Sequence, residues 1–222
     1  SDVYKRQGLE EVSEGFQKAS SRLNTAGNAL TVGLTTPLVA AGAAAVNYAS
    51  DTEEALNKVD VAFGSSAESV KAWSDTTLTS IGLAKGTALD MAALYGDMAT
   101  SMGFSEEAAA DMAKELVNLA GDLASFKNIS VDEVNTALKS VFTGETESLK
   151  NLGVVMTEVN LENYALSKGL SQTYQSMDQN EKVALRYQYV LDMTKNAQGD
   201  FARTTDSTAN QIRILQESLK EA

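Results

Sequence analysis

The sequence predicts an all-α protein, in which a compact multi-helix domain lies between two helices with heptad-patterned, coiled-coil-like apolar residues. The 222 residues include a single Pro, and Pro is the residue that most disfavours a helix. Hydrophobic residues make up 43% of the chain but aromatic residues only 6%, so Ala, the best helix former, supplies much of the apolar content. Apolar residues also recur at the three- and four-residue spacings of amphipathic helices.

Residues 1–7 read SDVYKRQ, which is what the codons TCA GAT GTG TAT AAG AGA CAG encode. Because these codons look like a transposon-type sequencing adaptor, we expect this stretch to be an artefact; a processed natural N-terminus is the alternative. The stretch has no apolar region of the kind that signal peptides carry. The last residues, ESLKEA, contain no Gly or Pro to stop a helix, so we expect the chain to be a window from a longer protein.

Residues 8–35 are expected to form an amphipathic, coiled-coil-like helix. Their apolar residues are spaced alternately by three and four, the pattern of a heptad seam. The seam consists of Leu9, Val12, Phe16, Ala19, Leu23, Ala26 and Leu30. Two interpretations stay open, namely a helix that packs on its own domain and a helix through which copies of the chain associate.

Residues 36–203 are expected to form the helical core. Their first helix contains an apolar run, which could be buried in the protein or could act on a membrane. Thr36 can cap this helix, with Pro37 at its first position. The apolar run Leu38–Val46 is much shorter than the roughly 20 residues that span a bilayer. Its small residues suit close packing of helices. We therefore expect a buried helix, with a membrane-active segment as the alternative.

The middle of the chain is predicted to be a series of capped helices. Each begins at a Ser, Thr or Asp that precedes acidic residues, and carboxylates in a first turn complement the helix dipole. The expected starts are Ser65 or Ser66, Thr87 with Asp90, Ser105 with Glu106, Ser130 with Glu133, and Asp178 with Glu181. The helix from Ser66 is expected to reach Leu78, and Gly199 is expected to end the helix that begins at Asp178.

Two stretches within this series resemble each other at a constant offset of 25 residues. They are LYGDMATSMGFSEE (Leu94–Glu107) and LAGDLASFKNISVD (Leu119–Asp132). Each is interpreted as the end of one helix, a turn, and the cap of the next helix. Gly96 and Gly121 are expected to let neighbouring helices approach closely.

Residues 204–222 are expected to begin an extended C-terminal helix with a second heptad seam. Its apolar residues are Ile212, Leu215, Leu219 and Ala222, again spaced by three and four. With the seam of residues 8–35, it makes self-association a natural expectation.

The composition argues against most enzyme chemistry. The chain has no His and no Cys, so it lacks the commonest general base, the commonest metal ligand and any thiolate site. Glu145 and Glu147 are the one carboxylate pair that could serve as the general acid and general base of a hydrolase. Their spacing of two residues makes them diverge on a helix, and we interpret them as first-turn residues of a short helix between Gly144 and Gly153. We expect no enzymatic activity, no cofactor and no metal site.

The net charge of −12 argues against specific nucleic-acid binding. The chain has 18 basic and 30 acidic residues, and the basic residues are scattered. A surface that binds nucleic acid needs clustered Lys and Arg to neutralise phosphates.

Three segments, taken in order, resemble the core region of phage tail tape measure proteins, the phage-related minor tail protein family. They are FTGETESLKNLGVVMTEVNLENYALSKG, MDQNEKVALRYQYVL and AQGDFARTTDSTANQIRILQESL. The resemblance covers the chain roughly from Leu30 to Leu219. The residues that carry it are Gly144, Glu145, Leu149, Leu152, Gly153, Arg186, Tyr187, Gly199, Asp200 and Phe201.

The resemblance implies a long, helical, homo-oligomeric structural protein of the virion tail, assembled in the cytoplasm of the host bacterium. Such a protein sets tail length, scaffolds assembly of the tail tube, and is ejected during genome delivery. The implied partners are the tail tube protein, tail assembly chaperones and tail-tip proteins, with transient contact to the host membrane. A membrane-active helical module that aids penetration of the host envelope is the alternative function.

Overall fold

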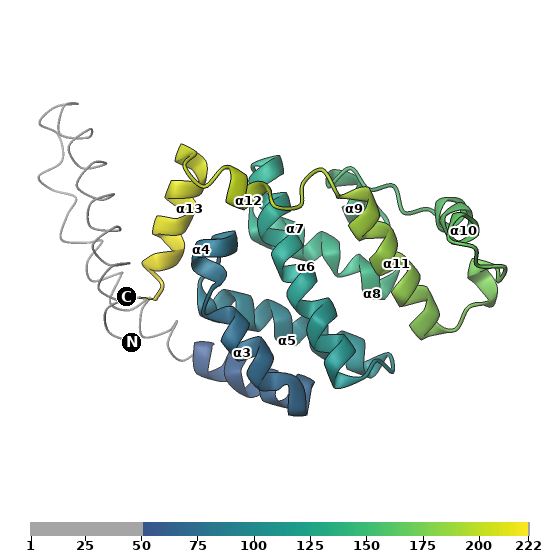
Figure 1. Cartoon of the computed structure of the whole chain (residues 1–222), viewed down its shortest axis with the longest axis horizontal. Coiled ribbons are helices and arrows are strands. Elements are labelled where there is room, and N and C mark those ends of the chain that lie inside the picture. The colour runs from purple at the N-terminus through teal and green to yellow at the C-terminus, as the bar shows by residue number, and fades with distance from the viewer. Residues whose placement is uncertain (1–50, 222) are drawn as a thin grey trace, which may run out of the picture. The chain divides into compact units, whose positions relative to one another are not determined.

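All regular structure in residues 51–221, the part of the chain that the computed structural model describes, is helical (Figure 1). The predicted all-α class is therefore confirmed for these residues. Residues 51–221 all belong to one compact unit. The seam residues Leu9 to Leu30 and the apolar run Leu38–Val46 lie outside the described residues.

Short turns and loops join the helices. In chain order, the helices are one over residues 51–63, η1 (Gly64–Ser66), α3 (Ala67–Ser74), α4 (Thr77–Ile81), α5 (Lys85–Ser101), α6 (Glu106–Lys127), α7 (Val131–Leu138), α8 (Ser140–Thr143), α9 (Glu147–Asn151), α10 (Glu158–Ser167), η2 (Tyr174–Ser176), α11 (Gln179–Met193), α12 (Asp200–Arg203) and α13 (Thr208–Ser218).

Helix α6 is the centre of the packing. Figure 1 shows it crossing the middle of the domain, with α3 and α5 on one side and α11 on the other. Its 22 residues include Leu116, Val117, Ala120 and Leu123, which are almost completely buried. The apolar core therefore forms around one long helix, and the shorter helices are arranged about it.

Two glycines bring helices into close contact, as the sequence predicted. A Cβ atom at Gly121 would lie 2.7 Å from both the Cβ and the carbonyl oxygen of Ile81. A Cβ atom at Gly96 would lie 2.2 Å from the ring of Phe63. Both distances are shorter than Cβ contacts in proteins, so a side chain at either position would force its neighbour to shift.

Three of the predicted caps are confirmed. The side chains of Ser105, Ser130 and Asp178 accept hydrogen bonds from the backbone three residues on. Asp178 and Glu181 form a complete capping box, because the Glu181 side chain also accepts from the Asp178 N–H. These interactions satisfy N–H groups that have no partner inside their helices.

The two similar stretches also adopt the same local structure. Helices α5 and α6 both end in a left-handed residue, Gly103 at φ 89° and Asn128 at φ 54°. The N–H of the next residue then bonds back to a carbonyl oxygen five residues earlier, from Phe104 to Ala99 and from Ile129 to Ala124, each at 3.1 Å. The interpretation as helix end, turn and cap is confirmed for both copies.

One predicted helix end and one predicted helix start need correction. The helix that begins near Ser66 stops at Ser74, and Leu78 lies in the separate helix α4. At this break the Thr77 hydroxyl donates to the carbonyl oxygens of Ser74 and Leu83. Helix α5 starts at Lys85, before Thr87, and the carboxylate of a distant residue, Glu217, receives the Ala84 N–H.

Gly199 does not end α11 as predicted. The helix finishes at Met193, and the Thr194 hydroxyl bonds to the Val190 carbonyl oxygen as the chain turns away. Gly199 instead precedes α12, with φ at 75°.

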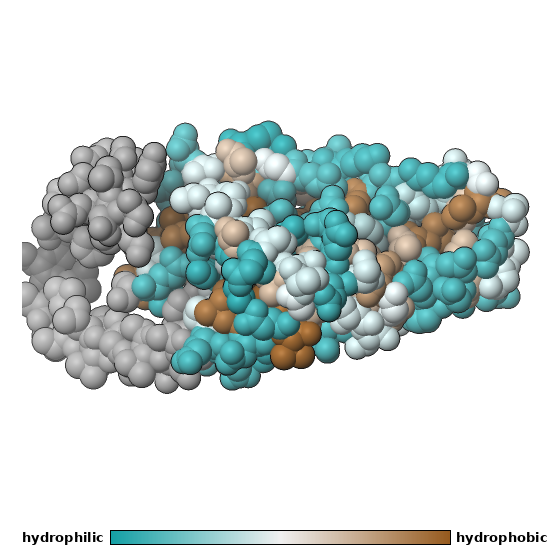
Figure 2. Space-filling model, turned by 60° about the horizontal axis from the view of Figure 1, so that its bottom comes forward, coloured by the Kyte–Doolittle hydropathy of each residue, from teal (hydrophilic) through white to brown (hydrophobic). Residues whose placement is uncertain are grey.

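Apolar side chains also lie at several separate places on the surface, among polar ones (Figure 2). Those of substantial size are Val61, Phe126, Val155, Val159, Leu166, Leu170, Met193, Ile212 and Leu219. No helix within residues 51–221 combines the length and the apolar character needed to cross a bilayer.

Candidate functional site

The residues that carry the family resemblance gather at two places in the fold. Gly144 to Gly153, together with Arg186, form the joint between α8 and α9, which we call the α8–α9 joint. Gly199, Asp200 and Phe201 lie where α12 meets α6. Tyr187 is next to Arg186 in sequence but its hydroxyl reaches α6.

Arg186 organises the α8–α9 joint from the neighbouring helix α11. Its Nε donates to the Val141 carbonyl oxygen at 2.6 Å, and one terminal nitrogen donates to the Phe142 carbonyl oxygen at 2.8 Å. The other terminal nitrogen donates to the Tyr174 hydroxyl at 2.8 Å. The buried guanidinium thus satisfies carbonyl groups that the short helix α8 leaves free.

Gly144 makes room for this arginine. It has φ at 76°, in the left-handed region that favours glycine, and it ends α8. A Cβ atom at Gly144 would lie 3.0 Å from a terminal nitrogen of Arg186. Gly144 and Arg186 are therefore parts of one structural unit, although they are 42 residues apart in the sequence.

Glu145 lies just before α9, which begins at Glu147, so its prediction as a first-turn residue needs correction; it caps the helix from outside. Its carboxylate accepts from the Glu147 N–H at 2.6 Å and from the Ser148 hydroxyl at 2.7 Å. These hydrogen bonds, that of the Ser148 side chain first, lower the pKa of Glu145 below its usual range. Glu147 instead pairs with Lys150 at 2.7 Å on the surface. As a cap and a surface ion pair, the two carboxylates have separate structural roles.

The apolar residues of the joint anchor it to the core. Leu149 and Leu152 are buried, and so are Val154 and Met156 in the connector that follows. Gly153 reverses the chain between them with φ at 77°. The joint is therefore a packed turn, as the sequence predicted.

Tyr187 links α11 to α6 through a hydrogen bond from its hydroxyl to the Glu115 carboxylate. Burial, and then this carboxylate, raise the pKa of Tyr187 well above its usual range. The phenol therefore stays protonated and acts as a donor.

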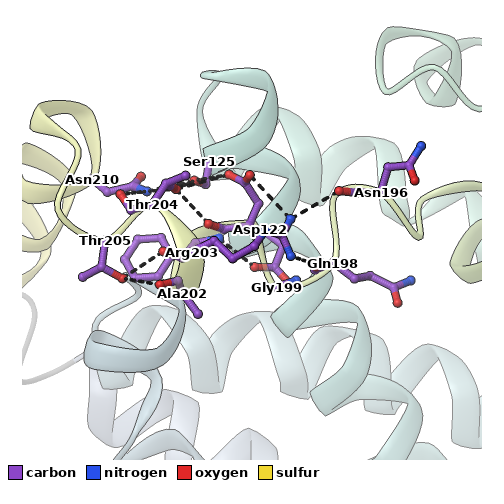
Figure 3. A network of polar contacts seen from close by, with 12 residues as sticks. Asp122, Ser125, Asn196, Gln198, Gly199, Ala202, Arg203, Thr204, Thr205 and Asn210 are labelled. Carbon is purple, nitrogen blue, oxygen red and sulfur yellow. Dashed lines mark hydrogen bonds and ion pairs between the residues drawn. The ribbon is translucent and has the colours of Figure 1, made fainter.

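Asp122 of α6 holds the start of α12 (Figure 3). Its two carboxylate oxygens accept from the Gly199 N–H at 2.6 Å and from the Phe201 N–H at 3.1 Å. Phe201 itself is completely buried. The carboxylate of one helix thus supplies the cap that the short helix α12 does not provide for itself.

Around Asp122 a wider set of polar side chains joins α6, α12 and α13, and we call it the α12 network. It consists of Asp122, Ser125, Asp200, Thr204 and Asn210 (Figure 3). The Ser125 hydroxyl donates to the Asp200 carboxylate at 2.7 Å, and the Asn210 amide donates to the Ser125 oxygen at 2.8 Å. The same amide reaches the Thr204 carbonyl oxygen at 3.1 Å.

Opposing effects act on the Asp122 carboxyl group in the α12 network. Burial raises the pKa of Asp122, and the nearby Asp200 carboxylate acts in the same direction, while the Gly199 and Phe201 N–H groups oppose both. No buried side-chain nitrogen or oxygen within the described residues lacks a hydrogen-bond partner. The polar groups of the network are thus engaged with one another.

The C-terminal seam residues of α13 point away from this network. Ile212 is 50% exposed, Leu219 is 56% exposed, and Leu215 is half-buried between them. The side of α13 that contacts the domain carries Asn210, Arg213 and Glu217, together with the half-buried Ile214. Arg213 donates to the carbonyl oxygens of Ala124 and Ile129 at the end of α6.

Two open hollows lie on the surface of the described part. One, of about 500 Å³, lies between α10 and η2 and is lined by Glu158, Val159, Glu162, Asn163, Thr173 and Gln175. A second, of about 260 Å³, lies between α6 and α11. In residues 51–221 no three acidic side chains come together as a metal site would require.

The sequence did not point to Asp122, Ser125, Asn210 or Glu217. Asp122 belongs to the second of the two similar stretches, where its counterpart is Asp97. The structure buries Asp122 and exposes Asp97, so the shared Gly-Asp pair did not distinguish a network residue from a surface residue. The partners of Asp122 lie almost eighty residues away, beyond the range of local patterns.

Comparisons with known proteins give no family model, no curated protein and no solved structure that matches this chain.

Proposed function

We propose that this chain is part of a structural phage tail protein that sets tail length and scaffolds assembly of the tail tube. In this role it would be a homo-oligomer of the virion tail that contacts tube, chaperone and tip proteins and leaves the tail with the genome. The proposal begins from the ordered resemblance of three sequence segments to tape measure proteins.

The observation that supports it most is the structural use of the residues that carry the resemblance. Arg186 satisfies the end of α8, Glu145 caps α9, and Asp200 belongs to the α12 network. Their polar atoms are engaged in joints between helices. Such a pattern suits a protein whose function depends on architecture and length.

The length of the tail tests the proposal directly. In a phage that encodes this protein, an in-frame deletion of about 40 helical residues from the full-length gene should shorten the tail by about 60 Å, at about 1.5 Å per residue. Electron microscopy of purified virions measures the change. Replacing the same segment with an unrelated helical sequence of equal length is the control and should leave tail length unchanged. Tails of normal length in the deletion phage would reject the proposal.

The alternative function, a membrane-active module, derives from the apolar run Leu38–Val46. Flotation of residues 8–222 with liposomes tests it, with and without anionic lipid. Protein that floats with the lipid supports membrane activity, provided that Leu38→Asp with Val39→Asp abolishes flotation. Protein that stays at the bottom of the gradient under both conditions rejects it.

A further inference from the structure

The hollow of about 260 Å³ between α6 and α11 has a largely apolar lining. Ala108 and Met112 of α6 line one wall, Ala184 and Tyr187 of α11 line the other, and Phe104, just before α6, adds a half-buried aromatic ring. Met112 and Tyr187 are almost completely buried and belong to the apolar core. A side chain that entered the hollow would therefore contact the core itself.

Hydrogen bonds between the two walls fix the shape of the hollow. The Tyr187 hydroxyl of α11 donates to the Glu115 carboxylate of α6. The Asn180 amide, in the first turn of α11, donates to the Met102 carbonyl oxygen, in the turn that precedes α6, at 3.4 Å. A site whose walls are already in place loses little conformational freedom when it is filled.

The size of the hollow indicates what it can hold. Its volume lies below the roughly 300–1,000 Å³ of sites for small molecules, but it is sufficient for one large side chain. Protein interfaces are commonly anchored by a few such side chains, each inserted into a well-packed pocket of the partner. The hollow therefore suits an anchoring side chain of a protein segment better than a free ligand.

The charges beside the hollow are negative. Asp111 belongs to its lining, and Glu115 lies one turn further along α6. The pKa of Tyr187 is raised first by burial and then by Glu115 and Asp111, so both carboxylates lie close to its phenol. None of the described residues that line the hollow is Lys or Arg. Lys114 pairs with Asp111 at 2.9 Å, but this pair is exposed and contributes little.

We propose that this hollow is a docking site for a segment of another protein that presents one large apolar side chain flanked by Lys or Arg. The apolar side chain would pack on Met112 and Tyr187, and the cations would lie beside Asp111 and Glu115. Charge complementarity also argues against a second copy as the occupant, because each copy carries a net charge of −12 and like charges oppose association. This inference goes beyond the proposed function, because it does not depend on a role in a tail.

NMR titration of the full, isotope-labelled chain with short peptides tests the proposal. The probe is the capped peptide Lys-Lys-Phe-Lys-Lys, and its matched controls are Lys-Lys-Gly-Lys-Lys and Glu-Glu-Phe-Glu-Glu. The probe should shift the amide signals of Ala108, Met112, Ala184 and Gln188 in a saturable manner. Both control peptides should bind at least several-fold more weakly. Equal binding of either control, or no binding of the probe, would overturn the proposal.

Variants of the chain show whether the probe occupies the hollow. Ala108→Trp and Ala184→Trp fill it from opposite walls, so one remains informative if circular dichroism shows that the other disturbs the fold. Either should abolish binding of the probe. Asp111→Lys should weaken binding several-fold, whereas Asp97→Lys, at an exposed position of α5, should leave it unchanged. Undiminished binding to a filled hollow, or equal effects of the two Lys variants, would reject the site. These measurements do not involve tail length, so the docking site can fail while the proposed function stands.

Discussion

Helices α6 and α13 belong to the same domain but are held in it by opposite kinds of contact. Helix α6 buries Leu116 and Leu123 completely and approaches Ile81 so closely that Gly121 has no room for a side chain. Helix α13 buries Asn210, bonds to backbone groups through Arg213 and Glu217, and exposes Ile212 and Leu219.

The difference indicates how stability is distributed through the domain. Burial of a large apolar side chain stabilises a fold by about 1.5–3 kcal/mol, whereas a typical hydrogen bond contributes about 0.5–1.5 kcal/mol net. We therefore expect α6 to open only when the whole domain unfolds. Helix α13 should open locally, at a lower free energy.

The largest effect is expected from truncating the core around α6. Leu116→Ala should lower the free energy of unfolding by about 2–5 kcal/mol, because it removes buried methyl groups and leaves a cavity. Leu219→Ala in α13 is the matched control and should change it by no more than about 0.5 kcal/mol. Urea denaturation followed by circular dichroism measures both. Similar losses in the two variants would remove the contrast between the helices.

A somewhat smaller loss is expected where α4 meets α6. Gly121→Ala should destabilise the domain by about 1–3 kcal/mol, since the added Cβ would collide with the backbone of Ile81. Glu107→Ala, at an exposed position of the same helix, controls for the change in α6 itself. The same denaturation experiment applies. A Gly121→Ala variant as stable as the unaltered chain would show that the contact is looser than described.

Loss of the Asp122 carboxylate from the α12 network should destabilise the domain. Asp122→Ala leaves the Gly199 and Phe201 N–H groups without their acceptor and should cost about 1–3 kcal/mol. Asp97→Ala removes the exposed counterpart in the other similar stretch and should be nearly neutral. Thermal unfolding of the two variants checks this. Equal effects would mean that the two aspartates have the same role.

The smallest effect concerns pH and the contact between α10 and α11. Asp192 accepts from Tyr164 and pairs with Lys168 and Lys195, each within 2.8 Å. These partners, Lys168 first, hold the pKa of Asp192 well below its usual range. A carboxylate with a lowered pKa stabilises the fold above its ordinary pKa of about 3.9 and loses that contribution as pH falls towards the folded value.

Asp192→Asn should therefore lower the midpoint of thermal unfolding at pH 7 and have less effect at pH 2–3. Differential scanning calorimetry at both pH values measures the two differences. A difference that stays the same at low pH would contradict the role of the ionised carboxylate.

Local patterns were enough to predict much of the fold. The caps at Ser105, Ser130 and Asp178 lie within three residues of their partners, so sequence spacing predicts them. The close contacts at Gly96 and Gly121 could also be expected, because glycine within a helix usually marks close packing. The break before Leu78 was missed because apolar spacing continues through it.

The joints between distant segments could not be predicted in the same way. Arg186 bonds to Val141, 45 residues away, and Asp122 bonds to Gly199, 77 residues away. The start of α5 is capped by Glu217, which is farther still. Partners so far apart in the sequence leave no local pattern from which they could be predicted. The apolar spacing of α13 also does not indicate which side of that helix faces the domain.

Hydrogen exchange of the α13 amides tests most directly whether polar contacts hold this helix in place. In the full chain, Arg213→Ala with Glu217→Ala should accelerate exchange across residues 208–218 while leaving α6 protected. Ile212→Ala with Leu219→Ala should leave exchange in the same residues within about a factor of two to three, which corresponds to roughly 0.5 kcal/mol. Faster exchange after loss of the apolar residues, with little change after loss of the polar ones, would contradict the account.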